Sequence, residues 1–316
     1  MDSKFDIPIL FLIFNRVDVA QQVFNQIKLI KPKYLFVAAD GPRVNNIEDV
    51  ISTKQTRDIV HQIDWDCEVK TLFRNENLGC GKSVSSAINW FFEQVDMGII
   101  LEDDCYPDLS FFPFCSEMLT RFKEDENVFL ISGTNLQNGI QRGEGSYYFS
   151  NYTLTWGWAS WKRAWRNFQF EVTDIDSTFN SDLLNNVFQS NIEKQFWKNK
   201  VISTIKLKQN IWDYQWVFSI WKNHGIGISP NVNLITNIGF RNTGSHKFLK
   251  DSLREPTIVS SINFPLVHPK KIINRDADYF TFKNTFSHSF SRIFRLIKEN
   301  GIKSVIKYTI TSVLKI

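Results

Sequence analysis

The first hundred residues alternate between short apolar runs and longer segments in which apolar side chains recur at helical spacing. Runs of this kind predict strands that are buried on both faces of a parallel sheet. Such runs occur at Pro8–Phe14, Tyr34–Ala39, Cys67–Phe73 and Met97–Leu101. The segments between them predict helices, over 17–30, 53–63 and 82 to about 92. Alternating strands and helices predict a mixed, mainly parallel sheet with helices on both faces.

Polar residues follow these strands directly. Arg16 comes after the first strand, Asp40 after the second, and the triplet Glu102-Asp103-Asp104 after the fourth. In open α/β sheets, ligands bind beyond the carboxyl ends of the strands. We therefore expect these side chains to meet at one edge of the sheet.

The second half of the chain has a less regular pattern. It predicts a helix over 109–123, a strand over 128–132, a Gly- and Asn-rich loop to residue 145, helical structure over 183–207 and from Trp212, and extended segments at 225–229 and 235–240. This organisation predicts one domain over 1–285, with halves at 1–132 and 133–285.

The C-terminal segment 286–316 has a basic amphipathic pattern. Phe290, Ile293, Phe294 and Ile297 alternate with Arg and Lys residues at helical spacing. A helix of this kind binds an anionic membrane interface, packs its apolar face onto the preceding domain, or pairs with a partner helix. The sequence leaves these three alternatives open.

The composition is that of a globular protein with an unusual share of aromatic residues. Hydrophobic residues make up 43% and charged residues 22% of the chain, which contains ten Trp and 28 Phe. Trp clusters line many sugar-binding grooves, although aromatic side chains also fill cores. The formal net charge is only +4 and gives no reason to expect a nucleic-acid partner.

The compartment is predicted from the cysteines and the apolar runs. The four cysteines form no CxxC pair and indicate reduced thiols in a cytoplasmic protein. The run near the N-terminus is too short and too interrupted for a signal peptide, and no stretch is long enough to span a bilayer. We expect a cytoplasmic protein, with peripheral binding to the inner face of the membrane if the C-terminal segment binds lipid.

Three consecutive carboxylates after a buried strand repel one another, and this repulsion raises their pKa values. A divalent cation removes that cost, and Mg²⁺ or Mn²⁺ held by one or two carboxylates and by phosphate oxygens is usual at phosphate sites. A solvated acidic turn is the alternative explanation. Because the triplet follows an apolar strand, we favour a metal site at Glu102-Asp103-Asp104.

The segment Ile99–Phe112, which contains this triplet, resembles the metal-binding motif and following helix of the GT-A glycosyltransferases. It is most similar to the N-acetylglucosaminyltransferase I type, whose motif is also Glu-Asp-Asp. The resemblance spans residues 7 to 250 through short motifs. It implies a GT-A, Rossmann-like fold with a nucleotide-sugar-binding half at 1–132 and an acceptor-binding half at 133–285. It also implies a nucleotide-diphosphate sugar as the donor, with UDP-sugars favoured, Mn²⁺ or Mg²⁺ as the cofactor, and a glycan or a lipid-linked acceptor.

The resemblance also implies roles for individual residues. Asp104 corresponds to the metal ligand, and Glu102 and Asp103 to groups that contact the donor; Arg16 and Asp40 correspond to residues that hold the nucleotide. Trp156, Trp158 and Trp212 correspond to acceptor-binding residues. Trp212 and Asp213 also correspond to the Trp-Asp pair that carries the general base, and Gly239-Phe240 with Gly244-Ser245-His246 to a loop that closes over the donor.

Two of the candidate donor contacts have plain structural alternatives. Lys82 follows a Gly-rich turn, whose N–H groups at a helix start suit a phosphate, but the glycine spacing is not that of a Walker loop. His246 would contact diphosphate or metal, although a lone His is more often structural. The alternative for Asp213 is a carboxylate stabilised by a helix N-terminus.

These features favour a metal-dependent, inverting hexosyl- or N-acetylhexosaminyltransferase acting in bacterial surface-glycan synthesis. Two alternatives stay open. A sugar-1-phosphate nucleotidyltransferase uses the same kind of sheet but needs a Gly-rich basic loop after the first strand. A catalytically silent carbohydrate- or membrane-binding protein would use only the Trp cluster and the basic C-terminal segment.

Overall fold

The computed structural model describes residues 5–206, 210–239 and 258–287, together with 294, 296–298, 301 and 302. The strands, in chain order, are β1 (Ile9–Ile13), β2 (Tyr34–Ala39), β3 (Glu68–Phe73), β4 (Met97–Glu102), β5 (Cys105–Pro107), β6 (Val128–Ser132), β7 (Tyr147–Ser150), β8 (Trp158–Trp161), β9 (Ile226–Pro230) and β10 (Ile235–Asn237).

The helices separate most of these strands. They are α1 (Val17–Ile30), α2 (Ile47–Arg57), α3 (Cys80–Gln94), α4 (Phe111–Arg121), α5 (Lys162–Trp165), α6 (Ile175–Asn180), α7 (Asn191–Lys206), α8 (Asp213–Lys222) and α9 (Arg275–Thr281). Two short 3₁₀ turns, η1 (Asp58–Gln62) and η2 (Asp182–Leu184), and one π-helical turn, η3 (Phe282–Phe286), complete the set.

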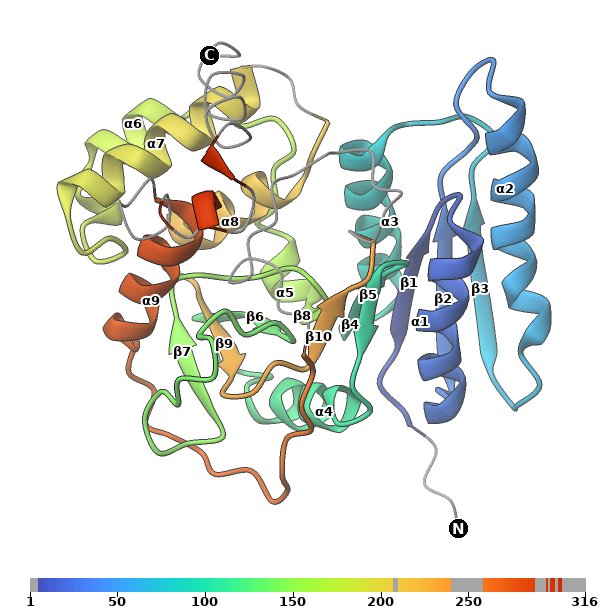
Figure 1. Cartoon of the computed structure of the whole chain (residues 1–316), viewed down its shortest axis with the longest axis horizontal. Coiled ribbons are helices and arrows are strands. Elements are labelled where there is room, and N and C mark those ends of the chain that lie inside the picture. The colour runs from blue at the N-terminus through green and yellow to red at the C-terminus, as the bar shows by residue number, and fades with distance from the viewer. Residues whose placement is uncertain are drawn as a thin grey trace.

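Eight strands form one central sheet in the order β3-β2-β1-β4-β8-β6-β9-β7, and β5 pairs with β10 in a separate antiparallel ribbon (Figure 1). β3, β2, β1 and β4 are parallel neighbours. β8 runs antiparallel between β4 and β6, β9 is parallel to β6, and β7 is antiparallel to β9. The fold is therefore mixed α/β with a mainly parallel sheet, as the sequence predicted.

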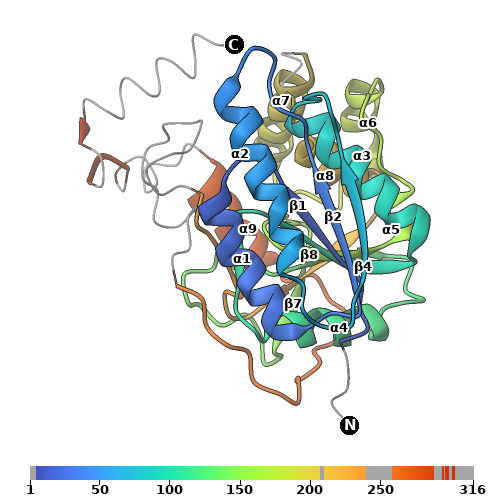
Figure 2. The same ribbon diagram turned by 90° about the vertical axis from the view of Figure 1, so that its right-hand side faces the viewer.

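The parallel half is a three-layer sandwich because its central strands are apolar on both faces. All five residues of β1 are buried. Phe11 packs with the buried face of α1 and with α4, whereas Leu10 and Leu12 pack with α3 on the opposite face. Figure 2 shows α1 and α2 on one side of the sheet and α3 and α5 on the other.

A third hydrophobic cluster lies beyond the sheet, among the helices of the second half. It contains Trp197 of α7, Phe218 and Trp221 of α8, and Phe282 of η3, all buried. α7, α8 and η3 thereby form a helical layer next to the antiparallel end of the sheet (Figure 1). This layer supplies one wall of the cavity described below.

The structure corrects several sequence-based boundaries. The helix expected at 53–63 begins earlier, at Ile47, because the Asn46 side chain caps it by accepting from the Asp49 N–H at 3.1 Å. β7 and β8 were not predicted as strands, since their aromatic residues show no period-2 polar alternation: all four residues of each are buried. Most of the expected tail at 286–316 lies outside the described residues.

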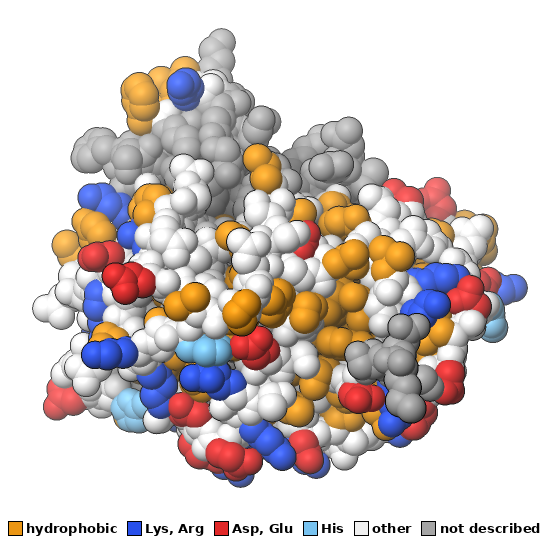
Figure 3. Space-filling model, turned by 90° about the horizontal axis from the view of Figure 1, so that it is seen from below, with side chains coloured by type: hydrophobic (Ala, Val, Ile, Leu, Met, Phe, Trp, Pro, Cys, Tyr) orange, Lys and Arg blue, Asp and Glu red, His pale blue; other side chains and the backbone are white. Residues whose placement is uncertain are grey.

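The surface carries a mixture of charges. On the described part of the face in Figure 3, Lys and Arg side chains are interspersed with Asp and Glu side chains. Such a mixed face differs from the continuous basic surfaces that bind nucleic acids. Among the helices of the described residues, none combines the length and the apolar character needed to cross a membrane.

A buried carboxylate in α9 makes the stability of the fold depend on pH. Asp278 is 1% exposed and accepts hydrogen bonds from the Ser150 hydroxyl and the Asn151 N–H. Burial, only partly offset by these bonds, raises its pKa to about 7. The folded state therefore binds a proton that the unfolded state releases at lower pH, so stability is lost as the pH rises from about 4 through 7.

We expect Asp278→Asn to remove this pH dependence. Between pH 5 and pH 8 the wild type should lose roughly 2–3 kcal/mol of unfolding free energy that the variant keeps. Urea unfolding at the two pH values measures the difference. Asp276→Asn, an exposed change on the same helix, is the matched control. An equal fall in the wild type and in Asp278→Asn would contradict the assignment.

Candidate functional site

An arginine and two aspartates join the ends of β1 and β4. The Arg16 guanidinium forms an ion pair with Asp103 and a second one with Asp104 at 3.0 Å. The parallel pairing of β1 with β4 carries both chain segments to the same edge of the sheet, so the predicted meeting of these residues is confirmed. Although burial lowers the pKa of Arg16, the two carboxylates raise it above its ordinary value.

The cluster carries more negative charge than Arg16 balances. Burial and the carboxylates of Asp104, Asp103 and Asp213 raise the pKa of Glu102. Burial also raises the pKa of Asp103, despite the ion pair with Arg16. Like-charged groups share this edge of the sheet, and a cation or a hydrogen-bond donor brought by a ligand would stabilise their ionised forms.

Asp213 reaches the same cluster from the other half of the chain. It is the first residue of α8, and it contributes electrostatically to the pKa of Glu102 and to that of the Cys80 thiol. Surrounding protein atoms and the four carboxylates raise the pKa of Cys80. The predicted general base and the predicted metal motif are therefore neighbours, although 109 positions separate Asp213 from Asp104 (213 − 104).

Asp40 lies at the same edge but bonds to its own chain. Its carboxylate is 6% exposed and accepts from the backbone N–H groups of Leu78 and Gly79 at 2.9 and 3.0 Å, and from that of Gly41. These bonds fix the turn before α3. In this structure the carboxylate therefore acts as an anchor for the loop.

The start of α3 is not an open phosphate cradle. Asn210 accepts from the N–H of Gly81 through its backbone oxygen at 2.9 Å and from the N–H of Lys82 through its side chain at 3.3 Å. Gly79, at φ +75°, leaves space for Asn210, since a Cβ there would lie 1.7 Å from the amide nitrogen. The Lys82 side chain is exposed, so only this side chain remains for the predicted contact with a ligand.

The ribbon of β5 and β10 brings another chain segment onto the Arg16 cluster. Ile238 donates its N–H to the Asp104 carbonyl at 2.9 Å. A Cβ on Gly239 would lie 2.5 Å from both an Arg16 nitrogen and an Asp104 oxygen, so a larger residue would require these side chains to shift. The predicted closing loop begins here, but Phe240 and His246 lie outside the described residues.

The predicted acceptor-binding tryptophans separate into two groups. Trp158 is 0% and Trp212 is 3% exposed, and their rings stack at 5.7 Å within a cluster that also contains Trp165 and Trp216. The prediction that Trp158 and Trp212 line a groove is therefore wrong, because both fill the core between the sheet and α8. Trp156, in contrast, is half-buried and lines a cavity.

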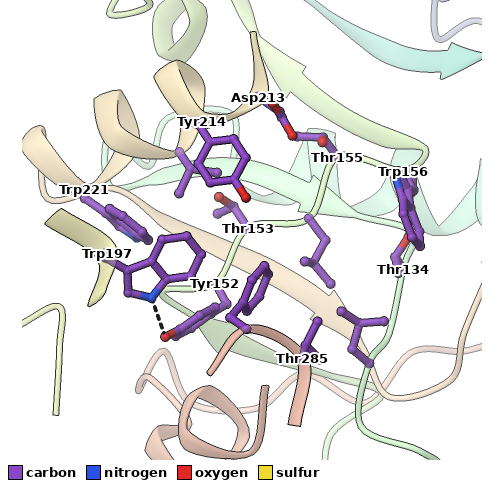
Figure 4. Close-up of a pocket in the computed structure, with 14 residues that line it drawn as sticks. Thr134, Tyr152, Thr153, Thr155, Trp156, Trp197, Asp213, Tyr214, Trp221 and Thr285 are labelled. Atoms are coloured by element: carbon purple, nitrogen blue, oxygen red, sulfur yellow. Dashed lines mark hydrogen bonds between the residues drawn. The ribbon is translucent and has the colours of Figure 1, made fainter. Parts of the chain in front are cut away.

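That cavity, of about 150 Å³, is bordered by Asp213, by Trp156 and by further residues that the sequence did not single out. Its lining combines threonines with aromatic side chains, which come from the segments after β6 and after β7, from α7 and α8, and from η3 (Figure 4). The sequence held one weak signal for it, the run Thr153-Leu154-Thr155 just before Trp156. Residues drawn from five separate segments give no local motif.

The acidic cluster suits a cation that arrives together with a ligand. Its donors are carboxylate oxygens, and the Asp104 side chain is 17% exposed against 6% for Asp103. Within the described ranges, no group of three or more His, Cys, Asp or Glu side chains is arranged to hold a metal. Mg²⁺ and Mn²⁺ commonly bind one or two carboxylates while substrate phosphates complete the shell, and the cluster fits that arrangement.

No protein-family model matches the chain, and no curated protein matches it in sequence. Three of the solved structures that match have low similarity, each with a TM-score of 0.32. HddC from Yersinia pseudotuberculosis is 9% identical, and the match covers 53% of this chain and 83% of HddC. A cytidylyltransferase from Leptospira borgpetersenii is 12% identical, with coverage of 54% of this chain and 64% of that one, and 4-diphosphocytidyl-2C-methyl-D-erythritolsynthase from Anaerococcus prevotii is 11% identical, with coverage of 55% and 82%. At this TM-score the matches carry no argument about activity.

The variant Asp40→Asn distinguishes two roles of Asp40: holding the loop before α3, and contacting the base of a nucleotide. The amide would place an NH₂ group against one of the backbone N–H donors, so we expect the unfolding free energy to fall by about 1–3 kcal/mol. If Asp40 only anchors the loop, the relative affinities for uridine, guanosine and cytidine diphosphates should not change. Urea unfolding and calorimetry measure the two effects, with the exposed Asp58→Asn as the control. A changed base preference at unchanged stability would assign Asp40 to the nucleotide.

Proposed function

We propose that this chain is a metal-dependent glycosyltransferase that moves a sugar from a nucleoside-diphosphate donor to a hydroxylated acceptor. The observation that carries the proposal is the convergence of Arg16, Asp104 and Asp213 at the carboxyl edge of the sheet. The candidate metal ligand, the candidate cation for the nucleotide and the candidate base therefore lie close together. The alternative explanation, a solvated acidic turn, gives no reason for a carboxylate from the other half of the chain to lie beside the triplet.

The donor would bind over the ends of β1 and β4, with the diphosphate near Asp104. A UDP-sugar is the favoured class. Asp104 would hold Mn²⁺ or Mg²⁺, with Glu102 close enough to share the charge. The cation would supply electrostatic stabilisation of the departing diphosphate. Gly239 lies directly against the Arg16–Asp104 pair, because a Cβ there would displace both side chains.

The reaction that follows is a direct displacement at the anomeric carbon. The acceptor oxygen forms a bond to that carbon while the bond from the carbon to the diphosphate oxygen breaks, and its electron pair leaves with the nucleoside diphosphate. The acceptor's hydroxyl proton passes to the Asp213 carboxylate. A single displacement inverts the anomeric configuration.

A sugar-1-phosphate nucleotidyltransferase is the alternative activity. It would join a nucleoside triphosphate to a sugar phosphate and release pyrophosphate. Enzymes of that class need a Gly-rich basic loop after the first strand. Here β1 ends at Ile13 and α1 begins at Val17, so the connection is too short for such a loop. This connection is the reason to prefer the glycosyltransferase.

Asp104→Asn should weaken donor binding. With Mn²⁺ present we expect one nucleotide sugar to raise the unfolding temperature of the wild type, because the ligand binds only the folded state. The variant should bind that donor at least about tenfold more weakly, which corresponds to one lost charged contact. Asp58→Asn is the surface control. Stabilisation by a triphosphate and a sugar phosphate instead would favour the nucleotidyltransferase, and no response to any nucleotide would favour a silent binding protein.

Asp213→Asn should separate catalysis from donor binding. The amide cannot take a proton, so we expect kcat to fall by roughly 10²–10⁴-fold while the affinity for the donor with Mn²⁺ changes little. Transfer, or slow hydrolysis of the donor when the acceptor is unknown, gives the rate, and calorimetry gives the affinity. Asp182→Asn, an exposed change in η2, controls for charge. A rate equal to that of the wild type would exclude Asp213 as the base.

A further inference from the structure

Helix α2 presents apolar side chains to solvent and polar side chains to the protein. Its buried residues are Asp49, Thr53 and Thr56. The exposed apolar residues of this helix and of the turn before it are Val44 (87% exposed), Ile47 (71%), Val50 (49%) and Ile51 (55%). A surface helix normally buries its apolar stripe and exposes its polar one. In α2 this arrangement is reversed, and the four exposed residues are called the α2 patch below.

The buried side of α2 is held by hydrogen bonds of its own. The Thr53 hydroxyl donates to the Asp49 carbonyl at 2.6 Å. The Asp49 carboxylate accepts from the Arg43 guanidinium at 2.8 Å and from the Asn15 amide at 2.7 Å. The α2 patch takes no part in these bonds, and Ile and Val are weaker helix formers than Ala, Leu, Lys or Glu. Helix propensity therefore does not explain the patch, whereas contiguous exposed apolar residues mark interaction surfaces.

The C-terminal segment carries the excess positive charge of the chain. Residues 286–316 contain six Lys or Arg and one Glu, a net charge of +5, while the whole chain has a net charge of +4. Residues 1–285 therefore have a net charge of −1. Within the segment, Phe294 is 72% and Ile302 is 57% exposed. Basic residues next to exposed apolar side chains complement a layer of anionic lipid head groups above an apolar interior.

The α2 patch and the described part of the C-terminal segment lie on the same side of the molecule. Figures 1 and 2 both show the start of α2 at the upper edge and the described part of the segment in the upper part of the view. Because α2 follows β2, it starts at the carboxyl edge of the parallel strands, where the Arg16–Asp104 pair also lies. A flat surface along this edge would contact both apolar elements.

The charge of the chain decides between two partners for these elements. A second copy of the chain would cover the α2 patch, but its residues 1–285 have a net charge of only −1 and do not complement a segment of +5. An anionic bilayer complements both the apolar patch and the basic segment.

We propose that the α2 patch and the C-terminal segment together bind the surface of an anionic lipid bilayer, with the carboxyl edge of the sheet turned toward the lipid. Val44 and Ile47, the most exposed residues of the patch, enter the head-group layer. The basic residues of 286–316 pair with the lipid phosphates.

The orientation would also select the acceptor, a step that rests on the proposed function. It turns the Arg16–Asp104 pair and Asp213 toward the bilayer. An acceptor attached to a lipid would then present its hydroxyl to Asp213 while its lipid part stays in the membrane. The lipid-linked class of acceptor is therefore favoured over a free glycan.

Vesicle flotation of the full chain tests the proposal. Vesicles of phosphatidylcholine alone are compared with vesicles that contain about 30% phosphatidylglycerol. We expect the anionic vesicles to bind about tenfold more tightly or better, because each Lys or Arg near an anionic surface adds roughly fivefold. Added salt should weaken that binding by screening. Equal affinity for the two kinds of vesicle, or no affinity for either, would overturn the proposal.

The variants Ile47→Asp and Phe294→Asp test the two contacts separately. Each replaces an exposed apolar side chain, so the unfolding temperature should be kept, and each should lower the affinity for anionic vesicles about tenfold or more. The matched control is Ile272→Asp, which changes a residue of 70% exposure in the segment that runs along the lower edge of Figure 1. Affinity of either variant equal to that of the control would show that its element does not touch lipid, contrary to the proposal.

Sedimentation velocity without lipid tests the second copy as the partner. We expect Ile47→Asp to sediment as the wild type does at every concentration. A reversible wild-type dimer that Ile47→Asp dissociates would assign the α2 patch to a second copy and overturn the proposal.

Vesicle binding needs neither donor nor metal, so it separates this inference from the proposed function. Donor binding with Mn²⁺ in a protein that ignores anionic vesicles would leave the glycosyltransferase standing and refute the membrane contact. Vesicle binding without a response to any nucleotide would support the membrane contact and remove the step that concerns the acceptor.

Discussion

The crowding of carboxylates around Arg16 is the constraint on which the rest of this structure depends. Asp103 and Asp104 directly follow β4, and the parallel pairing of β4 with β1 brings them against Arg16, which lies between β1 and α1. Burial raises the pKa of Asp103 even so, and Glu102 is affected in the same direction. The fold therefore keeps several carboxylates buried close together at a cost in free energy, and such clusters are typical of functional sites.

The position of Asp213 depends on contacts far from its own helix. Asn210, three residues before it, bonds to the first turn of α3, and Asp40 holds the loop that leads into that turn. The loop after β2, the start of α3 and the start of α8 are thus one hydrogen-bonded unit. The N–H groups that resemble a phosphate cradle in sequence are used to align the two halves of the chain.

The sequence predicted what local periodicity and strand ends determine. α1, β2 and β6 have the predicted bounds, and the meeting of Arg16 with the acidic triplet followed from parallel pairing alone. It did not predict β8, because Trp158–Trp161 is buried on both faces and inserts between strands that precede it in the chain. The same insertion explains the error about Trp158 and Trp212: aromatic composition suggested a groove, whereas the long-range pairing of β8 places Trp158 inside the core. The cavity lacked a signal because its lining comes from segments far apart in the chain.

The two regions that Asp213 borders differ in chemistry. Among the described residues, the cluster at Arg16 gathers more carboxylates than Arg16 balances, and burial raises the pKa values of Glu102 and Asp103. The cavity is lined mainly by threonines and aromatic side chains. Because Asp213 borders both regions, the proposed transfer of a proton to its carboxylate would take place where the acidic cluster meets the cavity.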